Sequence, residues 1–415
     1  MDQQHYTISL ESVFKAYYIC RKNKRKTFNA LKFEVNYECN CVKLWREINE
    51  KTYKIGKSIA FVISKPKYRE VFAADFRDRI VHHIIVMRLE PLFEKVFIQD
   101  NYNCRKEKGV LYGVKRFYTQ IKEISNDYTK DCYIGKFDMQ GFFMSIHKPT
   151  LWKFLKKFIE ENYNNEDKEI LLWLVYKVVT NNPEKNCIIK CPKERWRHIP
   201  ANKSLFTTGS NYGLPIGNLT SQIFANFYLH WFDIWMQSTF DGYGRYVDDF
   251  YIIDRDKDKI LKNINIIKKI LSSIQVKLHP KKIYIQHYSK GCKFTGSVIK
   301  MNRLYVGNYT RGQFFNKVIK LNNLKLDKNF YNNIEYIISC INSYLGFLIH
   351  YNSFNIRSNI LLTLDKKYSK YFSIGQDCKK IICKSNYKYN KILKQKLRNK
   401  YFYKKYKHYG KYIRK

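Results

Sequence analysis

Two adjacent carboxylates interrupt an apolar run in the middle of the chain. Asp248 and Asp249 lie within GRYVDDFYII, residues 244–253, and a third acid, Asp138, follows the short apolar stretch of CYIGKFDMQGFF, residues 132–143. Carboxylates at the ends of neighbouring strands can converge although they are far apart in sequence. Such oxygen ligands suit hard divalent cations such as Mg²⁺, and two of these ions support in-line phosphoryl transfer. The alternative without chemistry is a surface hairpin with an acidic tip.

The segments around these acids predict the elements that must position them. Residues 242–253 give an apolar strand, two acids and a second apolar strand, which is a hairpin signature. Farther upstream, residues 58–74 predict two short strands around a basic turn at 65–67. Residues 213–236 predict a Gly-containing loop followed by one long apolar helix.

A further helix is predicted over residues 75–97, where apolar residues recur at helical spacing. Asp75 or Asp78 can cap its first turn. His82 and His83 fall on this helix, and we expect each to be packed or hydrogen-bonded in the core rather than to bind a ligand.

Composition indicates a folded protein with a polyanionic partner. Hydrophobic residues make up 45% of the 415-residue chain, which suffices for a sizeable core. Lys and Arg number 77 against 35 Asp and Glu, giving a formal charge of +42, and this imbalance favours nucleic acid. Codon bias from an AT-rich genome is the alternative, but it explains the preference for Lys over Arg better than the imbalance.

No run of about 18 apolar residues and no signal-peptide pattern occurs, so we expect a cytoplasmic protein that makes no membrane contact. The 11 cysteines are scattered without a CxxC pair, which favours reduced thiols. Cys187, Cys191 and His198 come nearest to a metal cluster, but their spacing fits no zinc pattern well. Residues 387–415 interleave cations with aromatic rings, which suits single-stranded nucleic acid; a solvated basic helix or a disordered arm is the alternative.

The ordered motifs resemble those of reverse transcriptases. The resemblance runs from about Lys65 to Leu348. The matching segments are KFDMQGFF at 136–143, GLPIGNLTSQ at 213–222, YVDD at 246–249, HPKKIYI at 279–285 and KFTGSVI at 293–299.

The resemblance implies a role for each acid. Asp138 and Asp248 would be ligands of two Mg²⁺ ions, and Asp249 a supporting acid. The backbone carbonyl of Met139 would be a further ligand.

The resemblance also implies nucleotide contacts. Phe143 falls at the steric-gate position, where a bulky ring excludes a 2′ hydroxyl, and this predicts deoxynucleotide substrates; ordinary core packing is the alternative. Arg69, with Lys65 or Lys67 near it, matches the cations that clamp the triphosphate. Arg105 is a second candidate for nucleotide or template contact.

The nucleotide loop departs from the common family pattern. Most members carry glutamine before the glycine and proline after the serine, whereas Ile216 precedes Gly217 and Gln222 follows the serine here. IGNLTSQ looks like the loop of reverse transcriptases from diversity-generating retroelements. DFRDRIVHHIIV, the W-x-x-I-P-x-x-K-S-L-F pattern at 196–206 and INSYLGFLIHYNS point the same way. We expect Ile216 and Gln222 to lower fidelity, and the resemblance implies errors mainly opposite template adenines.

The resemblance to enzymes of diversity-generating retroelements also implies an RNA template and a protein partner. A template-repeat RNA, flanked by structured RNA, would be copied from dNTPs into mutated cDNA. A small basic accessory variability protein that forms a pentameric ring would assist. Other bacterial reverse transcriptases, such as a group II intron maturase, a retron enzyme or a phage-defence polymerase, are the nearest alternatives. An inactive RNA-binding scaffold is the alternative from another class.

The expected fold is α+β, a right-hand polymerase with fingers, a palm built on an antiparallel sheet and a helical thumb. Fingers with an N-terminal extension would span residues 1–120, the palm 121–300 and the thumb 301–372. Residues 373–415 would form a basic tail that binds RNA or is disordered.

Overall fold

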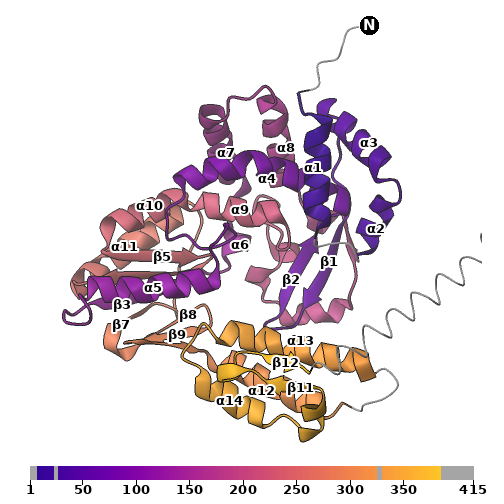
Figure 1. The fold of residues 1–415 in the computed structure, drawn as a ribbon. Coiled ribbons are helices and arrows are strands. Elements are labelled where there is room, and N and C mark those ends of the chain that lie inside the picture. Colours follow the sequence, from indigo (N-terminus) through magenta and orange to yellow (C-terminus); the bar gives the residue numbers. More distant parts are fainter. Residues whose placement is uncertain (1–6, 23–26, 325–329, 385–415) are drawn as a thin grey trace, which may run out of the picture. The chain divides into compact units, whose positions relative to one another are not determined.

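The computed structural model describes residues 7–22, 27–324 and 330–384, and the chain forms two compact units, Met1–Tyr288 and Ser289–Lys415 (Figure 1). The predicted RNA-contacting segment at 387–415 therefore lies outside the described residues. In the first unit the helices are α1 (Leu10–Arg21), α2 (Phe28–Glu34), α3 (Tyr37–Asn49), α4 (Phe76–Val96), α5 (Val110–Ile124), α6 (Phe142–Ser145), α7 (Lys148–Asn162), α8 (Lys168–Thr180), α9 (Leu219–Tyr228), α10 (His230–Thr239) and α11 (Lys257–Ser273). Its strands are β1 (Ser58–Ile63), β2 (Arg69–Ala73), β3 (Tyr133–Asp138), β4 (Cys187–Ile189), β5 (Gly242–Tyr246), β6 (Asp249–Asp254) and β7 (Tyr284–His287).

A four-stranded antiparallel sheet in the order β5-β6-β3-β7 forms the centre of the first unit. Neighbouring residues of β6 point to opposite faces. Phe250 stacks on Phe137 and contacts Phe232 of α10, whereas Tyr251 stacks on Phe117 of α5 with ring centroids 3.6 Å apart. Helices α10 and α5 therefore cover opposite faces, which confirms the α+β class with an antiparallel sheet.

The hairpin predicted over residues 58–74 is present as the antiparallel pair β1–β2. Strand β4 adds to this hairpin in parallel with β1, giving the order β2-β1-β4. β4 belongs to residues 181–212, the long connection between α8 and the nucleotide loop, which we call the insertion. The three residues of β4 are too few to show a strand periodicity in the sequence.

The helix predicted over residues 75–97 is α4, and the Asp75 side chain caps it by accepting from the Arg77 N–H at 3.1 Å. The prediction of a single long helix after the nucleotide loop was wrong, because this segment divides into α9 and α10 at Leu229. The Leu229 N–H bonds to the Asn226 carbonyl in a tighter, 3₁₀-like turn, so the α-helical hydrogen bonding is interrupted there.

The second unit is built from two small sheets and three helices. Its elements are β8 (Cys292–Phe294), β9 (Ser297–Lys300), β10 (Arg303–Val306), α12 (Asn308–Asn322), α13 (Phe330–Leu348), α14 (Phe354–Leu362), β11 (Phe372–Ile374) and β12 (Ile381–Cys383). The β10-β9-β8 sheet lies wholly in the second unit, which begins at Ser289, and it includes residues on both sides of position 300. Pairing of β11 with β12 places ordered structure beyond the predicted thumb limit at 372, in residues assigned to the tail.

Within the described residues no helix is long and apolar enough to cross a membrane, and no disulfide joins the cysteines.

A buried ion pair links α10 to β5. The Arg245 side chain is 0% exposed and that of Asp233 is 1% exposed, and both bonds of their bidentate contact measure 2.6 Å. Asp233 also accepts from the Tyr243 hydroxyl at 2.7 Å and from the Asn101 amide at 3.2 Å. Removal of the Asp233 carboxylate would therefore leave the Arg245, Tyr243 and Asn101 donors without this acceptor.

We predict that Asp233→Ala destabilises the first unit severely, because it leaves the Arg245 guanidinium buried without its counter-charge. Breaking such a pair costs about 3–5 kcal/mol of unfolding free energy, measurable by chemical denaturation. Glu161→Ala is the control, since Glu161 forms an exposed pair with Lys157 on one helix face and its loss should leave stability unchanged. Equal losses in the two variants would contradict the prediction.

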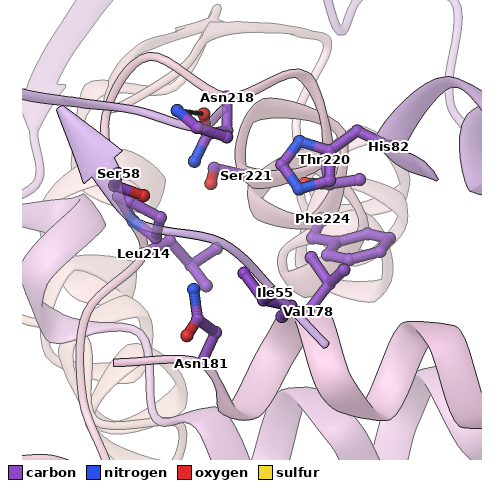
Figure 2. Close-up of a pocket in the computed structure, with 12 residues that line it drawn as sticks. Ile55, Ser58, His82, Val178, Asn181, Leu214, Asn218, Thr220, Ser221 and Phe224 are labelled. Atoms are coloured by element: carbon purple, nitrogen blue, oxygen red, sulfur yellow. Dashed lines mark hydrogen bonds between the residues drawn. The ribbon is translucent and has the colours of Figure 1, made fainter. Parts of the chain in front are cut away.

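His82 is buried on α4 and lines a cavity of about 10 Å³ together with Thr220 (Figure 2). Neither His82 Nδ1 nor Thr220 Oγ1 has a hydrogen-bond partner among the described atoms. Burial lowers the pKa of His82 to about 3, and the neighbouring His83 and Arg79 charges act in the same direction. The imidazole is therefore neutral in the folded protein, as expected of a core histidine.

We predict a pH dependence of stability from His82. Its folded pKa lies below the ordinary value of 6.5, so the unfolded chain takes up the proton more readily. The unfolding free energy should fall by up to about 1.4 kcal/mol per pH unit as pH decreases from 6.5 towards 3, with no contribution above 6.5. Denaturant titrations of wild type and His82→Gln across this range measure the difference, and parallel curves would contradict the assignment.

Candidate active site

The three predicted acids converge at one end of the central sheet. Asp138, the last residue of β3, is the cross-strand partner of Asp249, the first residue of β6. The Met139 N–H donates to the Asp248 carbonyl at 3.0 Å, and the His279 N–H donates to the Asp138 carbonyl at 2.8 Å. The first bond holds the end of β3 against the β5–β6 turn, and the second joins it to the segment before β7.

The carboxylates repel one another electrostatically. Burial raises the pKa of Asp248 to about 6, and the charges of Asp249 and Asp138 add to the rise. Burial also raises the pKa of Asp249. Two lysines oppose this repulsion: Lys282 Nζ lies 2.7 Å from Asp138 Oδ2, and Lys136 Nζ lies 3.7 Å from Asp249 Oδ1.

Among the described residues no group of three or more His, Cys, Asp and Glu side chains is arranged to hold a metal ion. The acids nevertheless fit a hard divalent cation chemically, since their donor atoms are all oxygen. A cation would also relieve the like-charge repulsion that raises the pKa of Asp248.

The side chain of Arg245 fixes the turn that carries Asp248. Val247 has a positive φ of 59°, an uncommon conformation for a β-branched residue. Arg245 Nη1 donates to the Val247 carbonyl at 2.9 Å while the same guanidinium is paired with Asp233. Neither Arg245 nor Asp233 was predicted to have this role, although an arginine within an apolar strand and an aspartate within an apolar helix were the available signal.

The predicted nucleotide loop is fastened to β2. The Phe72 N–H donates to the Ile216 carbonyl at 2.9 Å, and the Ala74 N–H donates to Asn218 Oδ1 at 3.1 Å. Gly217 has a φ of 117°, and a Cβ there would lie 2.8 Å from Val71 Cγ1, so this position requires glycine. The loop therefore follows β2 closely.

Phe143 and Ile216 lie in one neighbourhood. Both pack, partly buried, against a small apolar cluster that contains Phe72. Phe143 is on α6, whereas its neighbour Phe142 is buried in the main core, as expected. Gln222 lies on α9, where the Cys104 thiol contacts its Oε1.

The predicted cations differ in their surroundings. Lys65 and Arg69 are exposed, at the β1–β2 turn and the start of β2. Burial raises the pKa of Tyr246, and the Arg69 charge opposes that rise, so Arg69 lies within electrostatic reach of the β5–β6 hairpin. Arg105 instead pairs with Glu94 at 2.7 Å and is 5% exposed.

The Arg105 guanidinium also donates to the Ile98 and Asn101 carbonyls. These bonds commit Arg105 to holding the segment after α4, so the structure gives no support to a nucleotide contact. Cys187, Cys191 and His198 form no metal cluster among the described residues. The Val62 N–H donates to the Cys191 sulfur, and His198 stacks on Tyr68.

Comparison with known proteins decides the family. A profile described as "Reverse transcriptase (RNA-dependent DNA polymerase)" matches residues 57–299, more than half of the chain and all three acids. The chain belongs to the reverse transcriptase family. Reverse transcriptases generally use a divalent metal, which agrees with the oxygen donors at the sheet end.

The individual proteins to which this chain is similar share little sequence with it. Protein YkfC of Escherichia coli (strain K12) is 24% identical over 177 residues, covering 43% of this chain and 39% of that protein. Apo telomerase from Candida tropicalis has a TM-score of 0.48 and 15% identity, covering 74% of this chain and 56% of that chain. The same telomerase truncated from its C-terminal domain has a TM-score of 0.45 and 13% identity, covering 61% and 55%. The chain thus spans less than two thirds of the length of each.

Proposed function

We propose that this reverse transcriptase copies a template-repeat RNA into adenine-mutagenised cDNA for a diversity-generating retroelement. The observation that carries polymerase chemistry is the cross-strand pairing of Asp138 with Asp249, beside the turn that holds Asp248. The finer assignment is supported by the sequence of the loop at 216–222, in which Ile216 replaces the usual glutamine.

Asp138, Asp248 and the Met139 carbonyl would hold two Mg²⁺ ions, with Asp249 in support. When bound, these ions would favour deprotonation of the primer's 3′ hydroxyl and neutralise charge on the transferring phosphoryl group. Phe143 excludes a 2′ hydroxyl from the site. Arg69 and Lys65 bind the triphosphate, and their exposure leaves both available to it.

Ile216 borders the nascent base pair and offers it no hydrogen bond. A loss of about 1.4 kcal/mol in discrimination corresponds to about tenfold more error at a rate-limiting selection step. Gly217 lets the loop approach β2, and Gln222 completes the motif one turn into α9.

The first compact unit would hold the fingers and most of the palm, and the second the thumb. Substrates and partners would be the template-repeat RNA with its flanking structured RNA, dNTPs and the small basic accessory protein that forms a pentameric ring. The charge of +42 suits RNA beyond a short primer–template duplex.

We predict that Asp248→Ala lowers primer extension on an RNA template at least about a hundredfold, because ligand loss removes several kcal/mol of transition-state stabilisation. Chelation of divalent metal should have the same effect on the wild type. Asp241→Ala is the matched control, because Asp241 is an exposed acid just before the same hairpin. Extension that survives in Asp248→Ala, or an inactive wild type supplied with its RNA and accessory protein, would contradict polymerase function.

We predict that Ile216→Gln lowers misincorporation opposite template adenine about tenfold, since the amide restores hydrogen bonds that the alkyl group lacks. Sequenced cDNA from a fixed RNA template gives the error rate at each base. Ile216→Val keeps a branched alkyl group and should retain the errors. An adenine error rate that is unchanged in Ile216→Gln would remove Ile216 from the determinants of fidelity.

A further inference from the structure

One buried carboxylate of the first unit is surrounded by neutral donors. Glu70 on β2 is 2% exposed and accepts from Trp196 Nε1 at 2.7 Å, the Ser204 hydroxyl at 2.5 Å and the Leu205 N–H at 2.7 Å. No lysine or arginine pairs with it among the described residues. A buried carboxylate costs free energy unless such bonds satisfy it, so the three donors and Glu70 depend on one another.

All three donors come from the W-x-x-I-P-x-x-K-S-L-F segment at 196–206 of the insertion. We call Glu70, Trp196, Ser204 and Leu205 the Glu70 clamp. Through it a segment remote in sequence is fixed on the strand that begins with Arg69.

The clamp shares an apolar cluster with the nucleotide site. Leu205 is buried in the cluster that contains Ala60, Phe72 and Met144. Trp196 packs against the same cluster, as do Phe143 and Ile216. Because such clusters are close-packed, a displaced Trp196 ring changes the space available to Phe143 and Ile216.

The insertion also approaches α6 from its N-terminal end. The Asn202 carbonyl oxygen would lie only 2.5 Å from a Cβ at position 141, and Gly141 has a φ of 57°, so this close approach requires glycine. Beyond the clamp, the Leu214 N–H donates to the Phe143 carbonyl at 2.9 Å. The insertion therefore lies close to Gly141 at the start of the steric-gate segment, and the nucleotide loop is hydrogen-bonded to Phe143 itself.

We propose that the Glu70 clamp positions Phe143 and Ile216, so that Glu70 and Trp196 determine nucleotide selection without touching the nucleotide. The inference rests on the proposed function. The clamp fixes the positions of the steric-gate residue Phe143 and of Ile216, which borders the base pair. Misplacement of such groups by about 1 Å changes reaction rates strongly.

Single-nucleotide incorporation on an RNA template tests the proposal. The readouts are kcat/KM for the correct dNTP, for a mismatched dNTP and for the matching ribonucleotide, with KM and kcat resolved. Trp196→Phe keeps an aromatic ring but removes the Nε1–H donor and part of the indole volume, while Ser204→Ala removes a second donor with little change in volume. We expect each to change the correct-to-mismatch or deoxy-to-ribo ratio at least about fivefold, mainly through KM.

Glu70→Gln tests the carboxylate itself, and a control variant outside the cluster separates positioning from simple loss of stability. Its amide keeps one acceptor oxygen, so its selectivity should lie between that of wild type and Glu70→Ala. Trp45→Phe is the matched control, because Trp45 Nε1 also donates a 2.7 Å bond, to the Ile8 carbonyl, outside the cluster. It should lower the melting temperature without changing either ratio.

Ratios equal to those of wild type in Trp196→Phe and Ser204→Ala would overturn the clamp while leaving the polymerase assignment intact. The same change in Trp45→Phe would also overturn it, since the effect would then follow stability alone. Absence of incorporation by the wild type would instead remove the proposed function, and the clamp's role in nucleotide selection with it.

Discussion

A buried ion pair between Arg245 and Asp233 anchors the turn on which the candidate active site depends. Burying both charges is expensive, and a well-packed apolar pair would often be as stable. The guanidinium, however, also donates to the Val247 carbonyl and so holds a β-branched residue at positive φ. We infer that the pair fixes the conformation of this turn, because apolar side chains could replace its packing but not this hydrogen bond.

The fixed turn keeps the three carboxylates close together despite their mutual repulsion. Asp248 and Asp249 follow Val247 in the chain and lie beside Asp138. Lys282 and Lys136 offset the repulsion among the three carboxylates. Strand pairing prevents the carboxylates from separating, so the repulsion persists in the folded protein. A divalent cation bound between these carboxylates would relieve that repulsion.

Features carried by periodicity or by a recognised motif could be predicted from the sequence, and long-range contacts without such a signal could not. The β1–β2 hairpin, the α4 helix with its Asp75 cap and the acids at strand ends follow from periodicity, turn residues and short motifs. Strand β4 and the Glu70 clamp escaped prediction because each depends on partners more than 100 residues away. Arg105 was predicted as a second candidate for nucleotide or template contact, and its ion pair with Glu94 is visible only once α4 is folded.

Arg245→Lys tests most directly whether the buried pair exists to position the active site. Lysine keeps the charge but cannot bond Asp233 in bidentate fashion and reach the Val247 carbonyl as well. The measurement is the rate of single-nucleotide extension on an RNA template, with circular dichroism to show that the variant is folded. We predict a folded protein whose extension rate falls at least about tenfold. A folded Arg245→Lys enzyme that extends at the wild-type rate would contradict it.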